Sequence, residues 1–227
     1  MSKKLAIFGG QKVRKNPMPN RVAFGNSEVK NLNKAIKFYR GKNQDPPYSG
    51  IFEKKLCDKF SNYMGGGYTV AVATGTGAIY VAMKALNLPS NSDIIISPVT
   101  CSGNFSCITE QGHYPILVDA DFNSYNTSLE KIKEKLTKKT KLIQITHVGG
   151  EPVKDIDAIA NFAKKRGIYL LEDCSQSIGA KVNGKLVGTF GNISAFSTMY
   201  RKNLAANSSS GLIYTRKLSL YKKSLAF

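Results

Sequence analysis

The chain is 227 residues long, which suits one compact domain or a small two-domain protein, and its hydrophobic content of 42% is enough for a sizeable core. It contains no run of about 18 apolar residues, which excludes a typical membrane-spanning helix, and the apolar run near its N-terminus is too short for a signal peptide. We therefore expect a cytoplasmic protein that makes no contact with a membrane.

The formal net charge is +18, and three explanations for it stay open. Nucleic-acid binding would fit the sign of the charge, but the lysines are dispersed and no basic stripe interleaved with aromatic residues is present. The densest group, at residues 131–139, is typical of the solvated face of a helix. A small anionic substrate, such as a nucleotide-linked compound, or a lysine-rich genome explains the charge equally well, so a nucleic-acid partner is the least favoured.

The cysteines and histidines do not indicate a metal site. The chain has only two histidines, and its cysteines show no metal-ligand spacing. We expect buried, reduced thiols, as in a cytoplasmic protein. The four cysteines are Cys57, Cys101, Cys107 and Cys174.

The first 63 residues predict an irregular arm followed by two helices. Glycines and prolines interrupt residues 1–25, so we expect no regular element there. Ser27 is a suitable N-cap for a helix that runs to about Arg40, and after a turn at 45–47 a second helix covers 49–63. Apolar residues recur at helical spacing in both helices, and we expect them in the core: Val29, Leu32, Ile36 and Tyr39 in the first, and Phe52, Leu56, Phe60 and Tyr63 in the second.

From residue 68 onward, strands and helices are expected to alternate. Most expected strands are near-continuous apolar runs, such as 93–96 and 141–145, which suit a sheet covered by helices on both faces. Asn183-Gly184 predicts a hairpin turn, and a helix is expected to begin at Arg216. The expected strands are 68–73, 93–97, 115–119, 140–146, 168–172, 192–198 and 211–215, and the helices between them are 76–86, 103–111, 127–136 and 153–165.

A small, glycine-rich turn joins the first of these strands to the helix behind it. Its residues are Thr74-Gly75-Thr76-Gly77. Free backbone N–H groups at such a helix start attract a phosphate group, the Thr76 hydroxyl adds a donor, and the two glycines allow close approach. Taken alone, the segment is equally consistent with a turn that binds nothing.

Asp173 lies at the carboxyl end of the buried strand that begins at Ile168. Ligands of open α/β sheets gather at that edge, and a carboxylate there can stabilise a protonated pyridine ring. Glu172 points to the opposite face of the strand and is expected to be structural. The alternative role for Asp173 is an N-cap for a following helix.

Lys202 follows another apolar strand. A partly desolvated amine favours imine formation with an aldehyde, so Lys202 and Asp173 together predict a site for pyridoxal phosphate. Ser197, five residues earlier, could reach the phosphate. The alternative is that Lys202 is one more surface lysine in a lysine-rich chain. Its apolar neighbours are Phe196, Met199, Tyr200 and Leu204.

Taken in order, these segments resemble the DegT/DnrJ/EryC1/StrS family of sugar aminotransferases. The resemblance covers nearly the whole chain and rests on the ordered set, which is far more specific than any one motif. The set is Gly9-Gly10 with Arg14, the turn at 74–78, residues 93–98, residues 147–152 followed by 155–159, Glu172-Asp173 with Gln176, and Phe196-Ser197 followed by 202–204.

The resemblance implies the fold-type I architecture of PLP-dependent enzymes. This is a three-layer α/β/α large domain with a mostly parallel sheet, a small C-terminal domain, and a homodimer with shared active sites. For this chain it implies an N-terminal arm at 1–25, a PLP-binding large domain at 26–215 and, at 216–227, the start of a helix toward a small domain that is absent. The chain is therefore expected to be a truncated or split enzyme.

By the same resemblance, Lys202 forms the Schiff base with PLP, Asp173 pairs with the pyridine nitrogen, and Gln176 contacts the ring or its phenolic oxygen. The implied reaction moves an amino group, usually from glutamate, to a keto-sugar on a nucleotide, in polysaccharide or secondary-metabolite sugar biosynthesis. No metal is implied. The remaining implied cofactor-binding residues, around the phosphate, are Gly75, Thr76, Gly77 and Ser197.

Two local segments depart from the family pattern. Family members place an aromatic ring that stacks on the cofactor at about the position of Ser102, for which Phe105 is the nearest substitute. A Gly-Glu-Gly-Gly run normally follows the lysine, whereas residues 205–211 read Ala-Ala-Asn-Ser-Ser-Ser-Gly.

Two other functions stay open. A related PLP enzyme that dehydrates or epimerises its sugar is less favoured, because the family's sugar dehydratases replace the lysine with histidine. A catalytically inactive, PLP-binding remnant or regulatory module is the second alternative, and the altered 205–211 segment and the position of the chain end motivate it.

Overall fold

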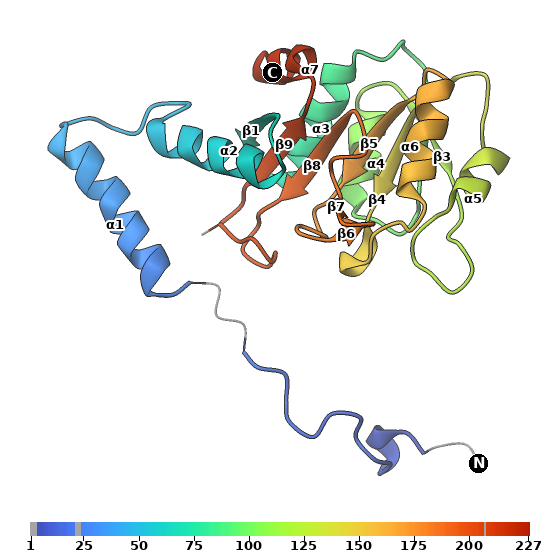
Figure 1. Cartoon of the computed structure of the whole chain (residues 1–227), viewed down its shortest axis with the longest axis horizontal. Helices are drawn as coiled ribbons and strands as arrows, with labels where there is room; N and C mark the ends of the chain where they lie inside the picture. Colours follow the sequence, from blue (N-terminus) through green and yellow to red (C-terminus); the bar gives the residue numbers. More distant parts are fainter. Residues whose placement is uncertain (1–3, 21–23, 207) are drawn as a thin grey trace. The chain divides into compact units, whose positions relative to one another are not determined.

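The computed structural model describes residues 4–20, 24–206 and 208–227. Within it the chain divides into two compact units, Met1–Asp45 and Pro46–Phe227 (Figure 1). The two units are described separately. The domain boundary expected at residue 25 stays a prediction.

The first unit contains a short 3-10 helix, η1 (Ala6–Phe8), and one α-helix, α1 (Asn26–Gly41). The backbone N–H of Gly25 donates to Glu28 Oε2 at 2.7 Å, which caps the start of α1. This bond lowers the pKa of the Glu28 carboxyl, with a further contribution from Ser27. The helix is therefore present as predicted, and its N-cap is Gly25, two residues before the expected Ser27.

The apolar stripe of α1 does not form a core in its own unit, contrary to our expectation. Val29, Leu32 and Ile36 are 56%, 50% and 46% exposed, and no residue of α1 is buried. Periodicity identifies the apolar face of a helix but not the element that covers it, and the described part of the first unit has no second element that packs on this face.

The second unit is built on a mixed sheet of seven strands, in the order β1-β9-β8-β5-β4-β2-β3. The strands β3, β2, β4, β5 and β8 run parallel to one another, and β9 is antiparallel to both of its neighbours. A separate two-stranded hairpin, β6 with β7, turns at Asn183-Gly184 as predicted. The strands are β1 (Tyr68–Val72), β2 (Asp93–Ile96), β3 (Tyr114–Leu117), β4 (Thr140–Thr146), β5 (Tyr169–Asp173), β6 (Lys181–Val182), β7 (Lys185–Leu186), β8 (Ile193–Ser197) and β9 (Gly211–Thr215).

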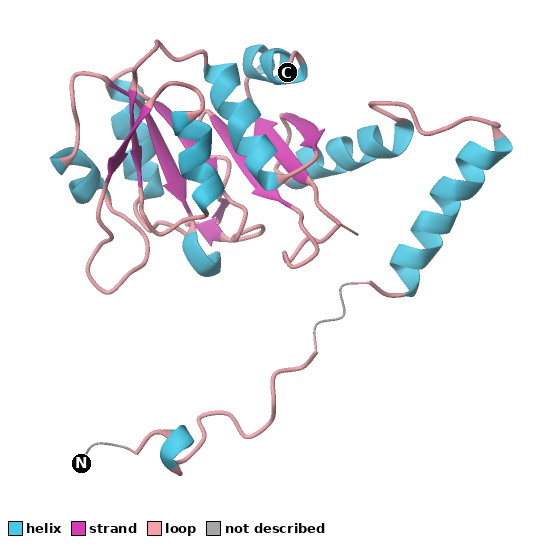
Figure 2. Ribbon diagram, turned by 180° about the vertical axis from the view of Figure 1, so that it is seen from behind, coloured by secondary structure: helices cyan, strands magenta, loops and turns pink. Residues whose placement is uncertain are grey.

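Helices cover both faces of the large sheet (Figures 1 and 2). One apolar cluster contains Phe60 of α2, Ile132 of α5 and Ile159 of α6. The other contains residues of α3, α4 and α7, among them Ile79, Ile108 and Leu220. The helices are α2 (Ile51–Tyr63), α3 (Gly75–Leu86), α4 (Ser102–Thr109), α5 (Leu129–Glu134), α6 (Ile156–Lys165) and α7 (Leu218–Leu225), with a 3-10 turn η2 (Val148–Gly150).

The expected three-layer α/β/α architecture with a mostly parallel sheet is therefore confirmed. Each strand of the large sheet lies close to its predicted bounds, because buried parallel strands read as continuous apolar runs. The helices are less well predicted. The segment expected at 153–165 becomes helical only at Ile156, and the segment expected at 127–136 shortens to Leu129–Glu134.

Of the four residues in the apolar stripe of α2, only Phe60 is buried in the core. Phe60 is 5% exposed and meets Phe196 edge-on, with 4.9 Å between ring centroids. Leu56 and Tyr63 are 41% and 51% exposed, so for these two residues the expectation of burial is wrong. They line a surface cavity of about 390 Å³ that also includes Ile178 and Leu204.

The four cysteines are unpaired, but only two of them are buried as expected. Cys107 and Cys174 are in the core, and burial raises the pKa of both thiols, that of Cys107 to about 11. Cys101, which directly precedes α4, is exposed instead.

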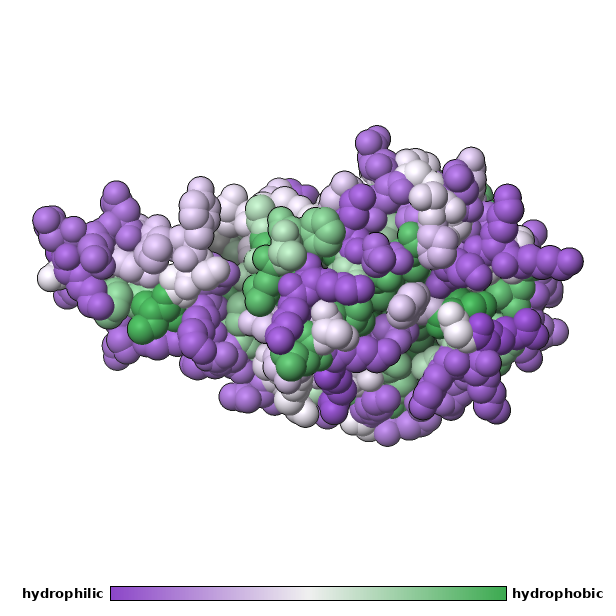
Figure 3. Space-filling model, turned by 90° about the horizontal axis from the view of Figure 1, so that it is seen from above, coloured by the Kyte–Doolittle hydropathy of each residue, from purple (hydrophilic) through white to green (hydrophobic). Residues whose placement is uncertain are grey.

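Hydrophilic side chains cover much of the face shown in Figure 3, between small apolar patches. Of the helices in the described ranges, none is both long and apolar enough to cross a membrane.

Candidate functional site

Three polar side chains share one face of the sheet at the carboxyl ends of three adjacent parallel strands. Thr146 ends β4, Asp173 ends β5, and Ser197 ends β8. Thr146 pairs with Asp173, and Asp173 pairs with Ala195, two residues before Ser197. Alternate residues of these strands, such as Leu171 and Ala195, pack toward α3 and α4, so the three polar side chains lie on that same face.

The Asp173 carboxylate is held by two hydrogen bonds. Asp173 is 3% exposed, and its Oδ2 accepts a bond of 2.9 Å from Nδ2 of Asn104, while its Oδ1 accepts one of 3.0 Å from the N–H of Ser175. No helix begins after Asp173, because residues 174–180 form turns. The alternative role as a helix N-cap is therefore wrong.

Asn104 belongs to a polar network that the sequence did not reveal. Its Nδ2 also donates to Thr100 Oγ1 at 2.7 Å, and its Oδ1 accepts from Nε2 of Gln144. The hydroxyls of Thr100 and Thr146 are 2.9 Å apart. The only sequence signal was an asparagine on the buried face of a helix, where an unpaired amide is costly.

The turn between β1 and α3 has the form expected of an anion site. Thr74 is the N-cap of α3, and its Oγ1 accepts from the N–H of Gly77 at 2.8 Å. In the described residues, the N–H groups of Gly75 and Thr76 have no protein acceptor. A helix of twelve residues with such a start attracts negative charge.

Ser197 lies directly against this turn. A Cβ placed on Gly75 would be 2.6 Å from the Ser197 Cβ and 3.0 Å from its Oγ. A Cβ on Gly103, at the start of α4, would be 2.6 Å from Oγ1 of Thr76. The structure thus brings Gly75, Thr76, Gly77 and Ser197 together, and two glycines permit that close packing.

Lys202 lies in the loop between β8 and β9, the two strands that follow Asp173 in the large sheet. The residue is half-buried, and its role as a desolvated amine stays a prediction. Its backbone N–H donates to the carbonyl of Met199 at 2.8 Å. The next residue, Asn203, donates through Nδ2 to the carbonyl of Ile178 at 2.8 Å, so this loop contacts the turns that follow Asp173.

Gln176 is exposed in those same turns. Its Oε1 accepts from the N–H of Gly149 at 2.8 Å, which ties the segment after β5 to η2, the segment after β4. Its amide group is therefore positioned at the carboxyl edge of the sheet, and its contact with a ring stays a prediction.

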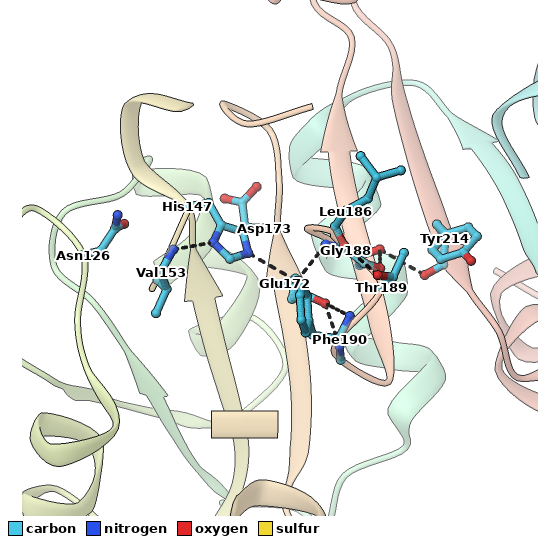
Figure 4. A network of polar contacts seen from close by, with 12 residues as sticks. Asn126, His147, Val153, Glu172, Asp173, Leu186, Gly188, Thr189, Phe190 and Tyr214 are labelled. Atoms are coloured by element: carbon cyan, nitrogen blue, oxygen red, sulfur yellow. Dashed lines mark hydrogen bonds and ion pairs between the residues drawn. The ribbon is translucent and has the colours of Figure 1, made fainter. Parts of the chain in front are cut away.

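Glu172, on the other face of β5, has a structural role (Figure 4). It is fully buried, and its two oxygens accept from the N–H groups of Gly188, Phe190 and Gly191 at 2.6 to 2.8 Å. Nε2 of His147 lies 3.2 Å from Glu172 Oε2, and its Nδ1 accepts from the N–H of Val153 at 3.0 Å. This second bond makes Nε2 the protonated nitrogen.

His147, Glu172 and Cys174 are close enough to hold a metal ion, with their ligand atoms within 4.8 Å of one another. The ring nitrogens and carboxylate oxygens, however, are already engaged in the hydrogen bonds just described. Burial also raises the pKa of the Cys174 thiol well above its ordinary value, which disfavours the thiolate that a metal requires. The donor set therefore fits a structural cluster better than a metal site.

The two departures from the family pattern have local explanations. Ser102 is exposed at the first position of α4, and Phe105 packs against the apolar cluster between the sheet and α3. Phe105 is thus partly buried against that cluster, and its role as a substitute for the stacking ring stays a prediction. In the 205–211 segment, close approach is required at Gly211, where a Cβ would overlap the Thr74 carbonyl oxygen, and this glycine is retained.

The chain is similar to known proteins in its sequence and in its fold. The sequence profile of the DegT/DnrJ/EryC1/StrS aminotransferase family matches residues 28–227. GDP-perosamine synthase of Escherichia coli O157:H7 is 34% identical over 178 residues, which are 78% of this chain and 48% of that protein. A dTDP-3-amino-3,6-dideoxy-alpha-D-galactopyranose transaminase of Aneurinibacillus thermoaerophilus is 36% identical over 139 residues, or 61% of this chain and 38% of that protein.

Solved structures show the same fold. An aminotransferase from Psychrobacter cryohalolentis superimposes with a TM-score of 0.85 at 29% identity, over 93% of this chain and 52% of that one. GDP-4-keto-6-deoxy-D-mannose-3-dehydratase of E. coli, with bound hydrated PLP, gives a TM-score of 0.82 at 28% identity, over 90% and 52%. The present chain thus spans about half the length of the proteins it matches. With the family profile matched over 28–227 and the expected architecture confirmed, the chain belongs to the DegT/DnrJ/EryC1/StrS aminotransferase family.

Proposed function

We propose that this chain binds pyridoxal 5′-phosphate and takes part in transferring an amino group from an amino acid, glutamate in the first instance, to a nucleotide-linked keto-sugar. The observation that carries the proposal is the buried Asp173 carboxylate, which shares a face and an edge of the sheet with the open N-terminus of α3. Bound PLP supplies an electron sink for the carbon that carries the amino group.

The phosphate end of the site is assigned to α3 and β8. The N–H groups of Gly75 and Thr76 would donate to phosphate oxygens, and the α3 dipole adds favourable charge. The hydroxyl of Ser197, packed against Gly75, would supply a side-chain donor. Gly77 contributes by donating its N–H to Thr74 Oγ1. This bond fixes the turn while the N–H groups of Gly75 and Thr76 stay available to a phosphate.

The ring end is assigned to Asp173. Its carboxylate uses two of roughly four acceptor positions for Asn104 and Ser175, which leaves acceptor capacity for a protonated pyridine nitrogen. A charge-assisted bond of this kind would hold the proton on the ring. Gln176 is assigned to the ring or its phenolic oxygen on the resemblance and on its place at this edge.

Lys202 is assigned to the aldehyde. Its amine nitrogen would form a double bond to the aldehyde carbon with the loss of one water molecule. Lys202 would also hold or move a proton at the substrate carbon when its amine is free. The half-buried position of Lys202, in a loop tied to the turns after Asp173, supports this role.

The substrate class rests on the relatives. Two of them are, by name, a GDP-perosamine synthase and a dTDP-amino-sugar transaminase, so we infer a nucleotide-linked keto-sugar for this chain as well. The net charge of +18 favours an anionic substrate of that type. A cytoplasmic location is inferred from the four unpaired cysteines.

We also infer a homodimer, as the family resemblance implies. Exposed apolar side chains on the second unit, among them Leu56, Tyr63 and Tyr200, support it, because such residues commonly mark protein interfaces. Light scattering is expected to give about twice the 24.8 kDa of one chain, and a monomer would contradict shared active sites.

The experiment combines spectroscopy with turnover. Purified chain mixed with PLP is expected to show a protein-dependent band in the visible, which Lys202→Ala abolishes and Lys164→Ala, an exposed lysine of α6, does not. Incubation with glutamate and a nucleotide-linked keto-sugar should yield the amino-sugar, detected by mass spectrometry. A band without product would favour the alternative of a cofactor-binding, inactive module, and no band in the unaltered chain would reject the proposal.

A further inference from the structure

Asn104 is almost completely buried, at 1% exposure, and its side chain makes polar contacts there. It projects from α4 toward the sheet, between Thr100 and two residues of neighbouring strands, Gln144 and Asp173. Both hydrogens of its amide nitrogen and its amide oxygen are engaged. Each hydrogen bond left unmade at such a buried amide would carry a desolvation cost. The geometry of the Asn104 amide beside the carboxylate is therefore closely defined.

The network fixes which way the amide faces. The Asp173 carboxylate can only accept, so the NH₂ group of Asn104 must point to it. The Asn104 oxygen then accepts from Nε2 of Gln144, which holds the amide in that orientation. Thr100 Oγ1 accepts the second N–H of Asn104. The Thr100 hydroxyl can in turn donate a hydrogen bond to Thr146 Oγ1.

We propose that Asn104 is a positioning residue that orients the Asp173 carboxylate toward the cofactor ring. The inference rests on the proposed function and extends it, because the carboxylate must face the ring nitrogen to bond to it. Ser175 contributes only a backbone N–H from the neighbouring turn, so Asn104 supplies the one side-chain donor to this carboxylate in the part of the chain that the structure describes.

The test exploits the near-identical shapes of asparagine and aspartate. Asn104→Asp places a second carboxylate against Asp173, Asp173→Asn removes the charge, and the double variant Asn104→Asp with Asp173→Asn exchanges donor and acceptor. In the double variant the pair can bond again, since the new amide at position 173 would donate to the new carboxylate at position 104 and still accept from Ser175. Unfolding is measured without cofactor for the four proteins, and PLP binding is measured for each by its visible band.

We expect both single variants to unfold at lower temperature than the unaltered chain and the double variant to recover most of that loss. In a further variant, Asn104→Ala, PLP affinity should fall about 10- to 100-fold, the range for losing one hydrogen bond to a charged group. In the double variant PLP affinity should stay below that of the unaltered chain. The pH profile of the visible band should also move in Asn104→Ala. Ser106→Ala, an exposed change on the same helix, is the control and should leave all three readouts unchanged.

Because the double variant also lacks the Asp173 charge, its stability reports only whether the pair at positions 104 and 173 is bonded. The role of Asn104 toward the ring is read from the PLP affinity and the pH profile of Asn104→Ala, in which Asp173 is kept. If Asn104→Asp fails to fold, Asn104→Ala and Asn104→Ser still report affinity and pH profile. Unaltered affinity and pH profile in Asn104→Ala, with a Lys202-dependent band in the parent, would overturn the role of Asn104 while the proposed function stands. No band in the parent would overturn both.

Discussion

At the scale of single residues, Gly211 is required by packing. Its missing Cβ would overlap the Thr74 carbonyl oxygen and lie 2.9 Å from the Gly75 nitrogen, so the β9 backbone lies directly against the turn between β1 and α3. Gly41, at the end of α1, has nothing within 4 Å of its Cβ position. Substituting alanine at both glycines therefore separates two effects. At Gly211 the added Cβ meets a steric clash, whereas at Gly41 only the conformational freedom of the backbone changes.

We predict that Gly211→Ala lowers the free energy of unfolding by about 1–3 kcal/mol, the usual cost of overpacking, and weakens PLP binding because the turn must shift. Gly41→Ala should cause no loss, since alanine is the better helix former. Urea unfolding and PLP titration measure both effects. Equal behaviour of the two variants would contradict the close approach at Gly211.

His113 is the residue whose burial should make stability depend on pH. It is 8% exposed, its Nδ1 has no partner among the described residues, and burial, with a smaller effect of Lys84, lowers its pKa below the ordinary 6.5. The unfolded chain therefore binds a proton at a higher pH than the folded chain does. Stability contributed by the neutral ring is present above pH 6.5 and is lost as the pH falls toward the lower folded value.

Accordingly, His113→Gln should flatten the fall in unfolding free energy between about pH 7 and pH 5, as measured by urea titrations at each pH. Lys84→Gln should flatten it less, because burial is the larger cause. A steeper dependence in His113→Gln than in the parent would show that the sign is wrong.

At the scale of elements, the start of α3 supports both the fold and the proposed phosphate site. Thr74→Ala removes the cap on the Gly77 N–H and should cost about 0.5–2 kcal/mol of stability together with a loss of PLP affinity. Thr74→Ser keeps the oxygen and should behave like the parent. Thermal unfolding measures the stability and PLP titration measures the affinity. A Thr74→Ala protein with both values unchanged would contradict a role of the Thr74 cap in either.

A helix or strand could be predicted from the sequence where its own residues carry the signal. Contacts between elements could not, because they depend on residues far apart in the chain. Buried parallel strands such as β4 and β5 were predicted closely because their apolar runs are continuous, and that placed Asp173 at the carboxyl edge of the sheet. The stripes of α1 and α2 identified apolar faces, but what covers a face depends on distant parts of the chain. Asn104 was missed for the same reason, since its partner Asp173 is 69 residues away and only the folded sheet brings the two together.

At the scale of the whole molecule, one edge of a three-layer unit carries every residue assigned to the cofactor. This follows from topology, because the carboxyl ends of adjacent parallel strands and the following loops meet at one edge. The sequence predicted that edge, the family and the architecture. It did not predict the division at Asp45, which depends on where contacts concentrate along the folded chain.

The most direct test of the central claim identifies which lysine binds PLP, in a chain with 33 lysines and arginines. PLP is added, the carbon–nitrogen double bond is reduced with borohydride, and the protein is digested and analysed by mass spectrometry. We predict one stoichiometric modification on Lys202, which disappears in Lys202→Ala and weakens in Asp173→Asn. Modification spread over surface lysines, or concentrated on a lysine far from Asp173, would contradict the account.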